Sequence, residues 1–201
     1  MRGGSGMKKW MSMLCILAVA LAMSGCGSSF QPSVSSLYIQ KDGRLTQAIV
    51  ESFEKDYYSL TEFESMINKE IDTYNRNYGE GEISLKQLEL KDQTLYLELD
   101  FSDADVYSAY NEEYCFVGTV EEALEAGLSF QMDFKDADYE DYSGADVTAK
   151  KSQHVAVLQN EGIVQLQSPV KYVSNNVEIL SDHIVQVMPI SDNAEYAYVI
   201  Y

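Results

Sequence analysis

Two stretches of the chain share a carboxylate-rich pattern that could bind a cation. LDFSDADVY begins at Leu99 and MDFKDADYE begins at Met132, and both contain D-F-x-D-A-D. Carboxylate oxygens are the ligands that Ca²⁺ prefers in proteins, and crowded carboxylates repel one another until a cation neutralises them. The acids are densest in the second stretch, where the candidate ligands are Asp133, Asp136, Asp138, Glu140 and Asp141.

Neither stretch fits a calcium loop of the EF-hand type. Such a loop needs a glycine at its sharp turn and a glutamate that closes it, and these positions are Ser108 and Tyr114 in the first stretch. A less regular calcium site at the second stretch stays open. The alternative is a solvated strand end whose acids cap a following helix. No other cofactor is expected, because His154 and His183 lack the paired spacing of a zinc site.

Catalytic motifs are weak. Ser52-Phe-Glu-Lys55 and Ser191-Asp-Asn match two motifs of penicillin-binding enzymes, but the K-T-G motif that should follow is missing and the chain is too short for that fold. Paired carboxylates could serve a glycosidase, and with 32 acids in the chain a pair is uninformative by itself. We therefore lean towards a protein that is not an enzyme, with an envelope hydrolase as an alternative.

Tyrosines are the more promising candidates for a binding surface. The chain has 15 of them, and each combines an apolar face with a polar tip. The candidates are Tyr107, Tyr110, Tyr139 and Tyr142. The alternative interpretation is that these rings only complete the borders of sheets and helices.

The N-terminus has the layout of a secretory signal. Lys8 and Lys9 precede an apolar run from Met11 to Met23, which is shorter than the roughly 20 residues that span a bilayer. The stretch Met23-Ser24-Gly25-Cys26 resembles the lipobox of bacterial lipoproteins. That resemblance implies cleavage before Cys26 and attachment of a lipid to its thiol.

The expected product is a protein held on the outer face of the cell membrane. Residues 1–25 would be the signal peptide, with residues 1–6 upstream of a better start at Met7, and residues 26–35 read as a flexible tether. Of the three cysteines only Cys115 would remain free, and its apolar neighbours favour a buried, inert thiol over a nucleophile.

The negative charge of the chain limits the kinds of partner that it can bind. Loss of residues 1–25 removes Arg2, Lys8 and Lys9 and no acid, so the mature chain would carry 11 basic and 32 acidic side chains, a formal charge of −21. Nucleic acid is excluded as a natural partner, because its binding depends on Lys and Arg that neutralise phosphates. The expected partners are the membrane, through the lipid on Cys26, and an envelope protein or glycan.

Local signals predict the elements that would position these residues. Asp42-Gly43 and Lys91-Asp92 each lie between alternating apolar runs and indicate hairpins over 37–51 and 83–101. Ser59 predicts a helix over 60–78, with Tyr74 in its apolar stripe. Shorter helices are predicted after a cap at Ser102 or Asp103 and after Thr119, and an alternating strand is predicted over 128–134.

The predicted fold is α+β, with antiparallel strands on one long and two short helices and a β-rich meander from about residue 151. Residues 36–201 would form one domain, with a division into 36–150 and 151–201 as the alternative. The expected role is a non-catalytic binding or scaffolding module of the cell envelope. A calcium-dependent adhesion or sensing module is a further alternative.

Part of the chain also resembles a known group of proteins. With the lipobox, the segments LYIQKDGRLTQAIVESFEKDYYSLTEFESMINKEIDTYN and GTVEEALEAG are similar to an uncharacterised group of small lipoproteins of Gram-positive, clostridia-type bacteria. The resemblance implies a place at the cell envelope. It assigns no activity to any residue.

Overall fold

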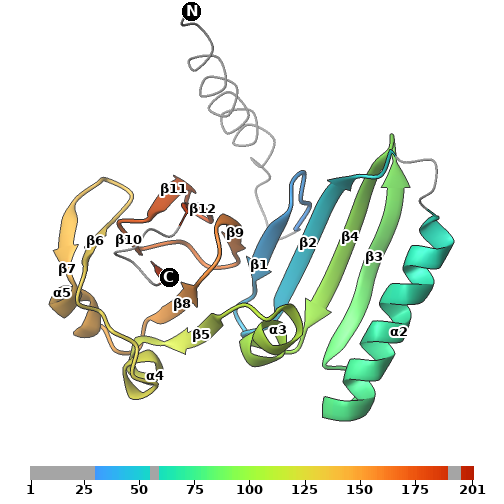
Figure 1. The fold of residues 1–201 in the computed structure, drawn as a ribbon. Coiled ribbons are helices and arrows are strands. Elements are labelled where there is room, and N and C mark those ends of the chain that lie inside the picture. Colours follow the sequence, from blue (N-terminus) through green and yellow to red (C-terminus); the bar gives the residue numbers. More distant parts are fainter. Residues whose placement is uncertain (1–29, 55–58, 190–195) are drawn as a thin grey trace, which may run out of the picture.

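Two β-sheets dominate the structure. The computed structural model describes residues 30–54, 59–189 and 196–201, and within them 41% of residues lie in strands and 23% in helices (Figure 1). The prediction of a balanced α+β fold is therefore wrong, because the described residues form 13 strands and only four helices. The signal peptide, Cys26, Lys55 and Ser191 lie outside the described residues.

The first sheet has seven strands in the order β11-β12-β9-β1-β2-β4-β3. Its strands are β1 (Ser36–Ile39), β2 (Leu45–Ser52), β3 (Ile83–Lys91), β4 (Thr94–Phe101), β9 (Gly162–Leu166), β11 (Val177–Ser181) and β12 (Ile184–Val187). Both predicted hairpins are confirmed: Gly43 takes a positive φ of 86° between β1 and β2, and Asp92 and Gln93 take 49° and 62° between β3 and β4. All pairs are antiparallel except β1 with β9, which corrects the prediction of purely antiparallel strands.

The second sheet has six strands in the order β5-β8-β13-β10-β6-β7. They are β5 (Cys115–Thr119), β6 (Asp133–Lys135), β7 (Asp141–Ser143), β8 (His154–Leu158), β10 (Tyr172–Ser174) and β13 (Ala197–Ile200). After residue 151 the chain alternates between the sheets, so the predicted meander is wrong. The segment is rich in strands, as predicted, but β9 leaves β8 to pair with β1 and β12. Residues 151–201 thus contribute to both sheets.

Four helices are described, one more than predicted. These are α2 (Leu60–Tyr78), α3 (Ala104–Asn111), α4 (Val120–Glu125) and α5 (Gly144–Thr148). The first three follow their predicted caps: Ser59 accepts the Glu62 N–H, Asp103 accepts the Val106 N–H, and Thr119 and Glu122 bond each other's backbone. The missed helix α5 has the same reciprocal cap, between Ser143 and Asp146.

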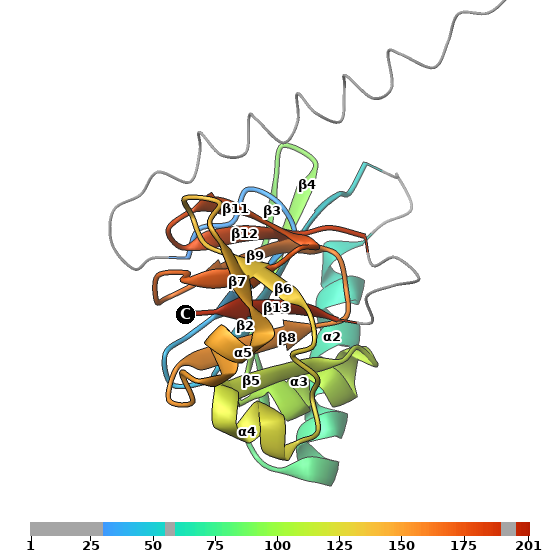
Figure 2. The ribbon, with the colours of Figure 1, turned by 90° about the vertical axis from the view of Figure 1, so that its left-hand side faces the viewer.

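The strands β8 and β13 are buried on both faces. One face of β8 carries Ala156 and Leu158 into the larger core, which contains the inner residues of the first sheet together with α2 and α3. The other face carries Val155 and Val157 into a smaller core with Val120 of α4 and with α5. Figure 2 shows α4 and α5 in front of the second sheet, whose edge is formed by the β6–β7 hairpin. Burial on both sides explains why these strands read as continuous apolar runs.

The strand predicted over residues 128–134 is almost absent, because only its end forms β6. The preceding segment instead folds against the start of α5. A Cβ atom added to Gly144 would lie 1.7 Å from the backbone oxygen of Phe130, so the two backbones meet where no side chain fits. Phe130 itself is buried in the smaller core.

Candidate functional site

The candidate calcium ligands lie on the β6–β7 hairpin, and Asp136 closes its turn. Oδ1 of Asp136 accepts the backbone N–H of Asp138 at 2.9 Å and that of Glu140 at 3.0 Å, and Oδ2 accepts the hydroxyl of Tyr142 at 3.1 Å. Desolvation alone would raise the pKa of Asp136, but these hydrogen bonds lower it. The carboxylate is thus engaged in building the turn.

Two of the remaining acids lie at paired positions of β6 and β7. Asp133 lies opposite Ser143, and Asp141 lies opposite Lys135. Over residues 30–54, 59–189 and 196–201, no group of three or more His, Cys, Asp or Glu is arranged to hold a metal ion. The calcium site stays a prediction from the sequence alone, and no geometry in this hairpin adds to it.

The two D-F-x-D-A-D stretches have different structural roles. In the first, Asp100 accepts the Thr46 hydroxyl at 2.6 Å and Asp103 caps α3. In the second, Asp136 closes a hairpin. The shared phenylalanines enter different cores, because Phe101 belongs to the larger core and Phe134 to the smaller one. What the stretches share is the end of a strand.

The four candidate tyrosines do not share one surface. Tyr107 and Tyr110 are on α3, whereas Tyr139 and Tyr142 are on the β6–β7 hairpin at the far end of the molecule (Figure 1). Tyr107 is buried and donates its hydroxyl to Glu113 at 3.0 Å. Tyr142 is half-buried against Tyr172, with ring centres 4.7 Å apart. Tyr139 is 68% exposed.

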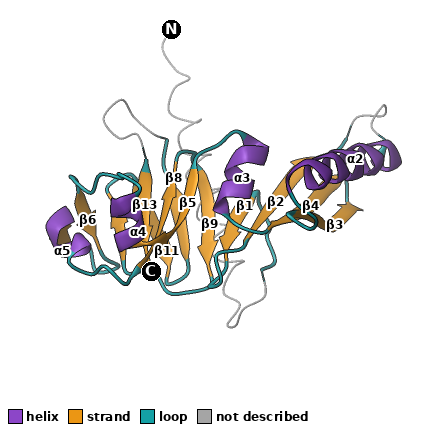
Figure 3. Ribbon diagram, turned by 90° about the horizontal axis from the view of Figure 1, so that it is seen from below, coloured by secondary structure: helices purple, strands orange, loops and turns teal. Residues whose placement is uncertain are grey.

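A cleft lies along one side of α2, and Tyr110 of α3 contributes to its wall. We call it the tyrosine cleft; its main residues are Met66, Lys69, Glu70, Tyr74, Tyr78 and Tyr110. It is wide open to solvent, with a volume of about 630 Å³. The lining residues of α2 recur at three- and four-residue spacing, so the cleft follows the helix for roughly 18 Å. Figure 3 shows α2 and α3 on the same side of the first sheet.

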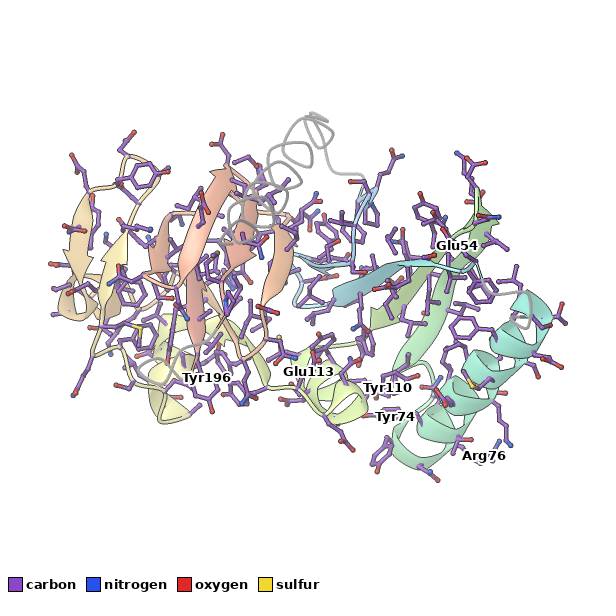
Figure 4. The ribbon with its side chains drawn as sticks, turned by 45° about the horizontal axis from the view of Figure 1, so that its top comes forward. Glu54, Tyr74, Arg76, Tyr110, Glu113 and Tyr196 are labelled. Carbon is purple, nitrogen blue, oxygen red and sulfur yellow. The ribbon has the colours of Figure 1, made fainter. Side chains whose placement is uncertain are left out.

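Three tyrosine rings form the aromatic part of this cleft. The Tyr74 ring lies 4.5 Å from that of Tyr78 and 5.8 Å from that of Tyr110, and it is nearly perpendicular to Tyr110. Figure 4 shows Tyr74 and Tyr110 on their two elements. Tyr78 is 71% exposed and Met66 is 48% exposed, so large apolar groups face solvent here. The exposed Tyr78 and its neighbour Tyr74 form an aromatic surface, and contiguous exposed apolar groups of this kind mark interaction sites.

Polar groups sit beside these rings. The Tyr110 hydroxyl donates to Oε2 of Glu70 at 3.4 Å. Burial, and then the Glu70 carboxylate, raises the pKa of Tyr110, so the phenol remains a hydrogen-bond donor at neutral pH. Thr73 and Asn77 also line the cleft. An aromatic floor with flanking donors and acceptors can hold a ligand that is both flat and polar.

The helix α2 exposes this cleft because its sheet-facing stripe is narrow. Ile67 and Ile71 are buried on the sheet, and Tyr74 continues their stripe but is only partly buried against the larger core. Met66 lies about 100° round the helix from Ile67 and is exposed. Sequence analysis placed Tyr74 in the apolar stripe and overlooked Tyr78. Their i, i+4 spacing was the available signal, since it sets two rings side by side on a helix.

A second cavity, of about 220 Å³, opens where the two sheets meet. It is lined by Glu113 and Glu161 together with apolar and uncharged polar residues. A burial-raised carboxyl pKa would have favoured a hydrolase. The described carboxyl groups with a resolved shift, Asp42, Glu122, Asp136 and Asp146, all have a lowered pKa. The structure thus adds no observation in favour of an acid–base pair.

Cys115 is buried, as predicted. Burial, and then the nearby Glu113 and Asp105 carboxylates, raises the pKa of its thiol to about 12, so it is protonated at neutral pH.

Comparisons with protein families, with characterised proteins and with solved structures find no match to this chain. Among the helices of the described residues, none has the length and apolar character needed to cross a membrane.

Proposed function

We propose that the protein is a non-catalytic binding module of the bacterial cell envelope, tethered to the membrane by a lipid on Cys26. The tyrosine cleft is its ligand site. The observation that carries the proposal is the exposed Tyr78 beside Tyr74 and Tyr110 in a cleft of about 630 Å³. Contiguous exposed apolar groups on a protein surface commonly mark a site of interaction.

The chemistry of the cleft favours a glycan as the ligand. Sugar rings present flat apolar faces that pack on tyrosine, and their hydroxyls need the donors and acceptors that Glu70, Thr73 and Asn77 offer. The length of the cleft along α2, roughly 18 Å, suits a short stretch of polysaccharide chain rather than a single ring. Among the described residues one cation, Lys69, and one anion, Glu70, line the cleft, so these two charges do not favour a strongly charged ligand.

Binding can be measured with a defined probe. The full chain carrying Cys26→Ser, which cannot be acylated, would be mixed with purified insoluble peptidoglycan and sedimented, and N-acetylglucosamine tetramer would serve as the soluble competitor. We expect Tyr78→Ala to weaken binding by about three- to tenfold, the loss typical of one aromatic contact. Removal of Tyr78 should not disturb folding, since its side chain is mostly in solvent.

Tyr139→Ala is the matched control. Tyr139 is as exposed as Tyr78 but lies on the β6–β7 hairpin, so its removal should leave binding unchanged. Failure of the unmodified cleft to bind either glycan, or equal loss from both variants, would contradict the proposed site.

The lipid anchor has its own test. The native protein, extracted from membranes and analysed by mass spectrometry, should begin at Cys26 and carry the mass of a diacylglycerol on that residue. Cys26→Ala should move the protein from the membrane fraction to the soluble one. An N-terminus beyond Cys26 without lipid would contradict the anchor and leave the cleft proposal intact.

A further inference from the structure

The cavity between the sheets has a chemistry that the tyrosine cleft does not share. It lies where the starts of the parallel strands β1 and β9 meet β2, the loop after α3 and the turn between β8 and β9. Leu37, Ile49 and Leu158 are among its apolar lining residues, and the uncharged polar side chains of Ser35, Ser36, Gln47 and Asn160 also line it. Its two charged lining groups are both acids, Glu113 and Glu161, and no Lys, Arg or His lines it among the described residues.

Glu113 is held in position at this cavity. The buried Tyr107 donates its hydroxyl to Oε2 of Glu113 at 3.0 Å, and Tyr107 itself lines the cavity. Burial, and then the Glu113 carboxylate, raises the pKa of Tyr107, so the phenol keeps its proton and the hydrogen bond persists through the neutral range. Figure 4 shows Glu113 between the two halves of the molecule, at the end of α3.

We propose that this cavity binds a small organic cation, a primary ammonium or guanidinium group on a short hydrocarbon, with the charge at Glu113 and Glu161 and the hydrocarbon against Leu37, Ile49 and Leu158. The cavity of about 220 Å³ holds the volume of roughly seven water molecules, which limits the ligand to a small one. A carboxylate beside apolar groups selects an organic cation over an inorganic ion. The carboxylate binds the charge, and the apolar groups take the place of water around the hydrocarbon, whereas they cannot replace the water around an inorganic ion. The formal charge of the chain, −18, attracts cations to the molecule as a whole.

Three probes with the same hydrocarbon chain length distinguish binding through the positive charge from binding through burial of the hydrocarbon. n-Butylammonium, 1-butanol and butyrate would be titrated into the full chain carrying Cys26→Ser, by calorimetry and by the shift of the melting temperature. We expect n-butylammonium alone to bind and to raise the melting temperature, since a ligand that prefers the folded state stabilises it. No binding of n-butylammonium at millimolar concentration, or equal binding of 1-butanol, would overturn the proposal.

Variants locate the site. Glu113→Gln keeps an acceptor for Tyr107 but removes the charge, and we expect the affinity for n-butylammonium to fall at least about tenfold, the loss typical of a charge-assisted contact. Glu112→Gln is the matched control, because this neighbouring side chain is exposed and does not line the cavity, so its affinity should stay the same.

Two further variants keep the result interpretable if Glu113→Gln lowers the stability of the protein. Glu161 is exposed on a turn, so Glu161→Gln should fold normally and still weaken binding. Tyr78→Ala should leave amine binding unchanged, which separates this cavity from the tyrosine cleft. Amine affinity that is the same in Glu113→Gln, Glu161→Gln and Glu112→Gln would mean that the cation is attracted only by the overall charge, and the proposal would be wrong.

Discussion

At Gly144 two backbone segments approach so closely that the residue must lack a side chain. The position also begins α5, where alanine would stabilise a helix by about 1 kcal/mol relative to glycine. Helix propensity therefore predicts that Gly144→Ala stabilises the protein, whereas packing predicts that it destabilises the protein. The distance decides between them, because a Cβ atom 1.7 Å from the backbone oxygen of Phe130 cannot be accommodated by a rotation of a flexible side chain.

We expect Gly144→Ala to destabilise the protein by about 1–3 kcal/mol, the usual cost of forcing extra volume into a packed site. The measurement is the midpoint of urea unfolding at neutral pH. Ala145→Gly, at the next and exposed position of α5, is the control for helix propensity and should cost about 1 kcal/mol or less. A Gly144→Ala variant as stable as the parent would show that the segment before β6 moves away without cost.

At the scale of elements, the predictable parts were those with local signals. The bounds of α2 follow from the Ser59 cap and Gly79, and both hairpins follow from turns of two or three residues. The same kind of signal was present for α5 in Ser143 and Asp146 and was overlooked. The short strands β6 and β7 carry too few residues for an alternating pattern to be visible.

The helix caps make stability depend on acid pH. Hydrogen bonds from Thr119 lower the pKa of Glu122 from its ordinary value of 4.5, and those from Ser143 lower that of Asp146 from 3.8. Each folded-state pKa lies below the unfolded one, so the stabilisation is complete above about pH 5 and is lost as the pH falls through the lowered values.

We expect the double variant Glu122→Gln, Asp146→Asn to lose less stability than the parent between pH 5 and pH 2.5, because its amides keep an acceptor oxygen but do not titrate. Urea unfolding midpoints across that range give the comparison. Glu51→Gln, Glu64→Gln removes the same number of charges at exposed positions outside the caps and should follow the parent. If both double variants have the same pH profile, the caps do not contribute to acid sensitivity.

At the scale of the whole molecule, neither the sheet order nor the tyrosine cleft could be read from the sequence. The pairing of β1 with β9 joins Ser36 to Ile163, and no local pattern encodes which of several apolar strands becomes a neighbour across such a separation. The tyrosine cleft likewise depends on contacts between segments that are far apart in the sequence. Tyr110 was a candidate from the sequence, but its partners Tyr74 and Tyr78 reach it only because α2 and α3 lie on the same side of the first sheet.

The topology also decides how the chain should unfold. If residues 36–150 formed an independent unit, they would keep their structure without residues 151–201. In the structure, however, β1 would lose its partner β9, and β5 would be separated from β6 and β7 because β8, β13 and β10 lie between them. The larger core would also lose residues of the later segment, among them Ala156, Leu158 and Val199.

We therefore expect a fragment of residues 36–150 to show no cooperative unfolding transition, whereas the whole chain unfolds in one transition. For the whole chain, far-ultraviolet circular dichroism and tyrosine absorbance should give coincident melting curves, since strands of both segments share one core. The fragment should also lack dispersed amide resonances until a separate chain of residues 151–201 is added. A sigmoidal melting curve for the fragment alone, or two separate transitions in the whole chain, would mean that the shared core does not couple the two segments.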